Sequence, residues 1–193
     1  MTTYLLSVHP ERLAKILNGE CTVEIRKSVP KLPCEVYVYC TKDKQELIRI
    51  IHPAYLPNCG RVQYALSQVN SNAYNKVNGI VVCKFVVDKV SKIGWKGNGY
   101  AVSPETYTGE TEDVARASCF QFTELHAYLG KKDGYAWHIT QLEVFDKPME
   151  LKDFYTFKKK TVYSGMDCPP YVDEVKTPLT KAPQSYCRVE VRK

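Results

Sequence analysis

One short segment constrains the fold more than any other part of the chain, because it joins a turn glycine to a strand of alternating character. The segment reads Gly19-Glu20-Cys21-Thr22-Val23-Glu24-Ile25-Arg26. Successive side chains of a strand point to opposite faces, so Val23 and Ile25 are predicted to enter a core. The other face then carries the polar groups of Thr22, Glu24 and Arg26. This face could bind or process a small polar ligand; the simpler interpretation is an exposed strand on which Glu24 and Arg26 pair.

The residues around this segment resemble the start of an ASCH domain, a branch of the PUA-like β-barrels. Leu6-Ser7-Val8-His9-Pro10 precedes a predicted helix, after which Gly19, Glu24 and Arg26 fit the family signature G-x-K-x-x-E/T-x-R. The resemblance covers residues 4–40 and the strand from Gly79, and extends more loosely to 135–145 and the end strand. Cys21 stands where the signature has lysine. In the members that are hydrolases, this lysine is a catalytic residue.

The order of predicted elements indicates an α+β fold. Apolar periodicity predicts helices at 10–17 and 118–129 and a short helix at 47–51. Alternation predicts strands at 4–8, 22–27, 35–40, 79–87, 135–145 and 186–191. With the resemblance, this order predicts a small PUA-like mixed β-barrel with flanking helices. We expect a single domain over residues 1–193, with insertions at 42–78 and 94–117.

Composition excludes several classes of protein. A chain of 193 residues can bury a core of its own, and no apolar run is long enough for a membrane span. The first residues lack the basic and apolar pattern of a secretory signal. The eight cysteines include no C-x-x-C pair, which argues against a zinc ribbon and favours free thiols in a reducing compartment. We therefore expect a cytoplasmic protein with no metal, no cofactor and no membrane partner.

Charge and aromatic residues are compatible with a nucleic-acid partner. The net charge is +6, which is mildly basic. Trp95 lies in a glycine-rich segment beside Lys96. Base stacking combined with positive charge is the general mode of binding to single-stranded nucleic acid. A tryptophan that folds back as a plug on the mouth of the barrel explains the same pattern.

The resemblance implies that the polar face of the segment lines a cleft. There Arg26 would contact a phosphate or a carbonyl. Glu24 would accept a hydrogen bond from an amine such as cytosine N4, or act as a base, and Thr22 would offer a hydroxyl. An RNA segment or a modified nucleoside or nucleotide in this cleft would also contact phosphate-binding and stacking residues, for which the candidates are Lys84, Trp95 and Trp137.

Hydrolysis is the alternative activity that the resemblance implies, because some ASCH proteins deacylate N4-acylated cytidine and others cleave RNA. Glu124 is the candidate for a second acid in such a site. Cys21 could itself be a nucleophile if a base such as His9, His126 or His138 activated it. A small, half-buried cysteine is the simpler explanation of Cys21.

Three functions therefore follow in order. The first is an RNA- or nucleotide-binding module. The second is a hydrolase with an altered site, because Cys21 replaces the lysine and Glu24 stands where the amidohydrolases place a nucleophilic threonine. The third is a protein-interaction adaptor, since ASCH domains also occur in transcription coactivators.

Overall fold

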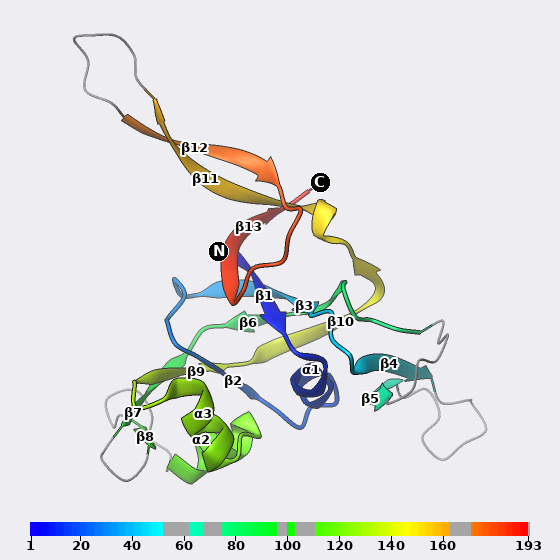
Figure 1. Ribbon diagram of the computed structural model, residues 1–193, viewed down its shortest axis with the longest axis vertical. Coiled ribbons are helices and arrows are strands. Elements are labelled where there is room, and N and C mark those ends of the chain that lie inside the picture. The colour runs from blue at the N-terminus through cyan, green and yellow to red at the C-terminus, as the bar shows by residue number, and fades with distance from the viewer. Residues whose placement is uncertain (52–61, 68–74, 96–99, 103–110, 163–170, 193) are drawn as a thin grey trace.

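The computed structural model describes residues 1–51, 62–67, 75–95, 100–102, 111–162 and 171–192. Its strands form three sheets (Figure 1). The largest has seven strands in the order β10 (Thr140–Met149), β6 (Val81–Val87), β3 (Cys34–Cys40), β1 (Thr2–Val8), β13 (Tyr186–Val191), β11 (Phe154–Val162) and β12 (Tyr171–Pro178). The second has the order β2 (Val23–Arg26), β9 (Gly134–His138), β7 (Val90–Trp95) and β8 (Tyr100–Val102). The third pairs β4 (Glu46–Ile51) with β5 (Val62–Ser67).

Three α-helices and one turn of 3₁₀-helix accompany the described strands: α1 (Pro10–Leu17), α2 (Thr111–Ser118), α3 (Phe122–Leu129) and η1 (Leu151–Asp153). The β1 and β3 strands are parallel, and α1 and β2 lie in the connection between them. Pro10 suits the first turn of α1 because its missing N–H would have no partner there. Gly19 takes a positive φ of 76° directly after the helix, which turns the chain into the motif segment.

The core has three parts, and one of them contains the apolar side of the motif strand. The largest lies between α1 and one face of the seven-stranded sheet, and includes Leu13, Ile16 and Phe85. The second packs Val23 and Ile25 of β2 against α2 and α3. The third lies around Leu5 and Phe154. Since Val23 and Ile25 are 2% and 1% exposed, the apolar face predicted for this strand is confirmed.

Three predicted elements are wrong in detail. Residues 47–51 form part of strand β4 rather than a helix, and their β-branched isoleucines fit a strand better. The predicted helix at 118–129 begins only at Phe122, because Ser118 ends α2 and the chain turns at Cys119, where φ is 53°. The predicted strand at 135–145 is also two strands, β9 and β10, which belong to different sheets.

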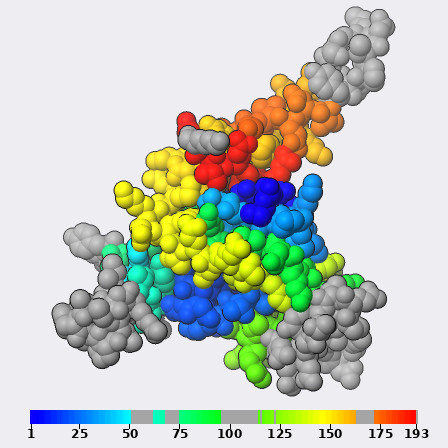
Figure 2. Space-filling view, turned by 180° about the vertical axis from the view of Figure 1, so that it is seen from behind, coloured from blue at the N-terminus to red at the C-terminus, as the bar shows by residue number. Residues whose placement is uncertain are grey.

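The architecture is mostly β with few helices, which is consistent with an α+β fold, and its described sheets have open edges rather than closing into a barrel. The β11 and β12 strands extend beyond the rest of the molecule as a two-stranded arm (Figures 1 and 2). No described helix is long and apolar enough to cross a membrane.

Candidate ligand-binding pocket

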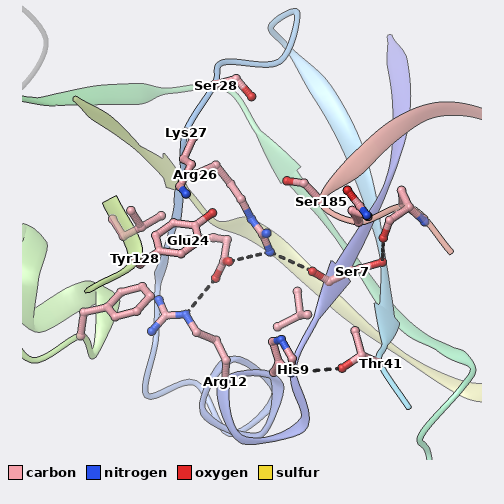
Figure 3. Close-up of a pocket in the computed structure, with 15 residues that line it drawn as sticks. Ser7, His9, Arg12, Glu24, Arg26, Lys27, Ser28, Thr41, Tyr128 and Ser185 are labelled. Carbon is pink, nitrogen blue, oxygen red and sulfur yellow. Dashed lines mark hydrogen bonds and ion pairs between the residues drawn. The ribbon is translucent and has the colours of Figure 1, made fainter. Parts of the chain in front are cut away.

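A pocket of about 660 Å³ opens on the polar side of β2. Its lining comes from the end of β1, from α1 and β2, from the region of α2 and α3, and from the segment that precedes β13 (Figure 3). The lining residues are Ser7, Val8, His9, Arg12, Glu24, Ile25, Arg26, Lys27, Ser28, Thr41, Phe120, Tyr128, Pro183, Gln184 and Ser185. A volume of this size is within the usual range for small-molecule sites.

The carboxylate of Glu24 lies between two guanidinium groups. Its Oε1 atom is 2.9 Å from Nη2 of Arg26, and its Oε2 atom is 3.2 Å from Nε of Arg12. The Glu24 side chain is only 3% exposed, and those of Arg26 and Arg12 are 10% and 14% exposed. The pairing expected between Glu24 and Arg26 is therefore present, but it is one half of a buried triad.

Arg26 carries more donors than its described neighbours engage. Its Nη2 atom contacts Glu24 and also donates to the carbonyl of Ser7 at 3.0 Å. Its Nε atom is buried and has no hydrogen-bond acceptor within the described part of the chain. A buried donor without a partner costs about 1–3 kcal/mol, so the Arg26 guanidinium favours an additional acceptor.

An aromatic wall and two cations line the side of the pocket nearest α3. The rings of Phe120 and Tyr128 are stacked, with centroids 6.1 Å apart. The Arg12 guanidinium lies 3.8 Å from the Phe120 centroid, and Nζ of Lys27 lies 4.9 Å from that of Tyr128. These cation–π contacts hold both positive charges at the pocket.

The pocket has a surplus of positive charge. Its lining contains Arg12, Arg26 and Lys27 against the single carboxylate of Glu24, which leaves a surplus of two positive charges, His9 not counted. His9 contacts Asp43 through Nδ1 at 3.2 Å. That contact and two backbone N–H groups lower the pKa of Asp43. Because its lining carries more positive than negative charge, the pocket is suited to a ligand with an anionic group.

Backbone and hydroxyl contacts of Ser7 tie the far wall of the pocket to the sheet. Oγ of Ser7 donates to the carbonyl of Pro183 at 2.7 Å, and its N–H donates to the carbonyl of Ser185 at 2.9 Å. Figure 3 shows Ser7 between Arg26 and the segment that carries Ser185. Residues 183–185, more than 150 positions from the motif in sequence, thus form a fixed part of the pocket.

Of the predicted ligand-binding residues, only Glu24 and Arg26 line the pocket. Thr22 is exposed outside it, where its backbone bonds to Ala117 and Ile139. Thr22 therefore offers no hydroxyl to this pocket, because β2 begins one residue later.

The other three predicted contacts also lie elsewhere. Lys84 forms ion pairs with Glu35 and Glu143 at 3.1 and 3.3 Å, and these contacts raise its pKa. Trp137 is fully buried and donates from its indole N–H to the carbonyl of Ser28, so it presents no stacking surface. Trp95 packs edge-on against His126.

The predicted catalytic residues beyond Glu24 are not in the pocket either. Burial raises the pKa of Cys21 to about 12, the opposite of what a nucleophilic thiolate needs. Its thiol donates weakly to the carbonyl of Ser118 at 3.5 Å. Glu124 is exposed and accepts the N–H of Gln121 at 2.9 Å, so it caps α3.

Candidate bases for Cys21 are engaged with other groups. His138 contacts the hydroxyl of Ser91 at 2.9 Å, and burial lowers its pKa. His126 packs against Trp95. His9 lines the pocket, where it contacts Asp43. Groups of three or more metal-ligating side chains are absent from the portion of the chain that the structure describes.

Comparison with known proteins gives a fold likeness and nothing more specific. No family model matches the chain, and no curated protein matches it. A crystal structure of ASCH from Zymomonas mobilis is 14% identical, with a TM-score of 0.46 over 78% of this chain and 74% of that chain. A single-substitution variant of that protein is 13% identical, with a TM-score of 0.49 over 98% of this chain and 89% of that one. At these values neither a family nor a residue role or activity is transferred to this chain.

Proposed function

We propose that this chain is an RNA- or nucleotide-binding module whose ligand occupies the pocket on the polar side of β2. The observation that carries the proposal is the surplus of two positive charges on a pocket with a stacked aromatic wall. Cations that contact phosphates and rings that pack on bases are the two components of nucleotide recognition. Neither component alone distinguishes a nucleotide from another anion, but the two together favour it.

Each part of a nucleotide has a complementary group in the pocket. The phosphate would bind Lys27 and the guanidinium of Arg26, because a guanidinium matches phosphate geometry. The base would lie near Tyr128 and Phe120. Each oxygen of Glu24 has further acceptor capacity beyond its arginine contact, so the carboxylate could accept from an exocyclic amine.

Binding is favoured over hydrolysis because no activated nucleophile lines the pocket among the described residues. Cys21 lies outside it and its pKa is raised. Glu24 is held by Arg12 and Arg26 on opposite oxygens.

The test is a binding titration of fluorescently labelled single-stranded RNA at several salt concentrations, comparing the wild type with Lys27→Ala. If Lys27 contacts a phosphate, the variant should bind more weakly and lower the salt slope by about 0.7. Lys159→Ala removes the same charge from the distant arm, where Lys159 is exposed on β11, and should leave both quantities unchanged.

Two results would contradict the proposal. One is equal weakening by Lys27→Ala and Lys159→Ala, which would show only a general effect of charge. The other is turnover of N4-acetylcytidine to cytidine, followed by absorbance, which would make the chain a hydrolase despite Cys21. Loss of that turnover in Glu24→Gln would then assign the reaction to this pocket.

A further inference from the structure

The arm formed by β11 and β12 has one edge that no described strand covers. The β12 strand is the last in the seven-stranded sheet, and it pairs with β11 alone. Figure 2 shows the arm standing clear of the main body. An uncovered strand edge offers a row of backbone N–H and C=O groups to another strand.

Two backbone hydrogen bonds at the base of the arm show which residues of β12 face outward. The N–H of Leu179 donates to the carbonyl of Phe154 at 2.8 Å, on the β12 side of β11. The N–H of Arg192 donates to the carbonyl of Asp153 at 2.7 Å, on the β13 side. Hydrogen-bonded pairs alternate along an antiparallel ladder. The register between β11 and β12 is unbroken from Tyr155 to Val162.

The alternation places the backbone groups of the even-numbered residues of β12 on the open edge. Leu179, and with it the odd-numbered residues, bonds to β11. Val172, Glu174 and Lys176 therefore direct their N–H and C=O groups outward. Pro178 lies in the same set but has no N–H to donate, so the usable edge ends before the arm meets the body.

The side chains of these edge residues carry alternating charge. Glu174 pairs with Arg188, and Lys176 pairs with Glu190 at 2.6 Å, both across β11. The four side chains thus form one face on which each acid lies beside a base. Glu174 and Lys176 are its outermost members, with opposite charges two residues apart on the edge.

We propose that a second copy of this chain binds the β12 edge, forming a two-fold symmetric, antiparallel pair of β12 strands. In the matching register, Glu174 of each copy lies opposite Lys176 of the other, and Val175 lies opposite its own counterpart. Each Glu174–Lys176 pair exchanges two backbone hydrogen bonds, and the symmetry produces the pair twice. The charged face then runs Arg188, Glu174, then Lys176 and Glu190 of the second copy, with alternating sign throughout.

Neighbouring registers lack this complementarity. A shift that centres the pair on Glu174 opposes two glutamates, and one that centres it on Lys176 opposes two lysines. Like charges directly across a ladder destabilise it. The chosen register also covers Val175, which is 39% exposed. Charge complementarity therefore selects one symmetric arrangement of this edge.

The test measures the molecular mass of the full chain by sedimentation over a wide range of protein concentration. The wild type should change from monomer to dimer with concentration. Glu174→Lys and Lys176→Glu each place two like-charge pairs across the interface, so each variant alone should dimerise at least about tenfold more weakly. An equimolar mixture of the two variants restores both attractive pairs and should form the heterodimer.

Folding of the variants is a separate measurement. Each substitution reverses the charge of one member of an exposed ion pair of the arm, and Glu174→Lys also places a lysine opposite Lys159 of β11. Because these charges are exposed, circular dichroism should show a folded chain with only a small fall in melting temperature. Glu174→Pro removes an outward N–H together with the Glu174 carboxylate but no hydrogen bond to β11, so it should weaken the dimer while the arm stays folded. A wild type that stays monomeric, or charge variants that dimerise as it does, would overturn the proposal. A mixture no better than either variant would refute the register.

Discussion

The Glu24 triad gives the sharpest test of what holds the pocket together. Replacing Glu24 by glutamine keeps the shape of the side chain and removes its charge. The amide oxygen can accept from one arginine, but the amide nitrogen then points its own donors at the other. Two guanidinium groups remain, with side chains only 10% and 14% exposed. The pocket therefore loses both ion pairs and retains both positive charges.

The expected cost is about 3 kcal/mol of the free energy of unfolding, the low end of the range for removing one partner of a buried ion pair. The low end applies because Arg12 retains contacts with Phe120 and with the carbonyl of Val23. For a chain of this size, that loss lowers the melting temperature by roughly 6–12 °C. Because the pair is shielded from solvent, the loss should change little with salt.

The assay is urea denaturation of the wild type and of Glu24→Gln, with the slope of the unfolding free energy against urea checked for equality. The matched control is Glu143→Gln. Glu143 makes an ion pair with Lys84, but its side chain is 61% exposed, so the control should lose less than about 1 kcal/mol. If both variants lost the same small amount, Glu24 would not hold the triad and the account of the pocket would be wrong.

Two further predictions concern a thiol and an imidazole. Burial raises the pKa of Cys21 to about 12. Iodoacetamide at pH 8 should therefore modify the half-buried Cys119 well before Cys21 in the folded protein. Peptide mapping by mass spectrometry gives the order of modification, and the reverse order would contradict the burial of Cys21. Because burial also lowers the pKa of His138 from its ordinary 6.5, the unfolded chain takes up this proton first as the pH falls. The free energy of unfolding should therefore decline below about pH 6.5. The decline should be steeper in the wild type than in His138→Gln, as denaturation at several pH values can show. Equal dependence on pH in the two proteins would refute the prediction.

Local periodicity predicted the motif strand because successive residues of a strand point to opposite faces, so that apolar and polar residues alternate. Val23 and Ile25 enter the core, and Glu24 and Arg26 line the pocket. Thr22 was placed wrongly because the strand begins after it. An alternating pattern shows which residues share a face but not where pairing starts.

The remaining walls of the pocket could not be read from local pattern. Phe120 and Tyr128 come to Arg12 and Lys27 only because α2 and α3 pack on the apolar face of β2. Arg12 lies on α1, whose apolar side the sequence had already indicated. Its place off that apolar side was the one sequence signal that it could reach the pocket.

Trp137 was expected to stack on a base because it is aromatic, but its burial excludes that role. Its ring is edge-on to Tyr186 at 4.8 Å, and its N–H donates to Ser28. Its alternation within β9 was compatible with either face of the strand. The choice between them depended on β13, which follows nearly fifty residues later.

The surroundings of Cys21 are suited to a small thiol rather than to a lysine at this position. The segment around Cys21 and the connection between α2 and α3 are joined by two weak hydrogen bonds. The Cys21 thiol donates to the Ser118 carbonyl, and the Cys119 thiol donates to the Glu20 carbonyl at 3.2 Å. The connection between α2 and α3 therefore closes over position 21, which is 2% exposed. A lysine there would have to bury its ammonium against thiols and carbonyls. The positive charge of the pocket comes instead from Arg12 and Lys27, each held over an aromatic ring, which suits a site that binds an anion.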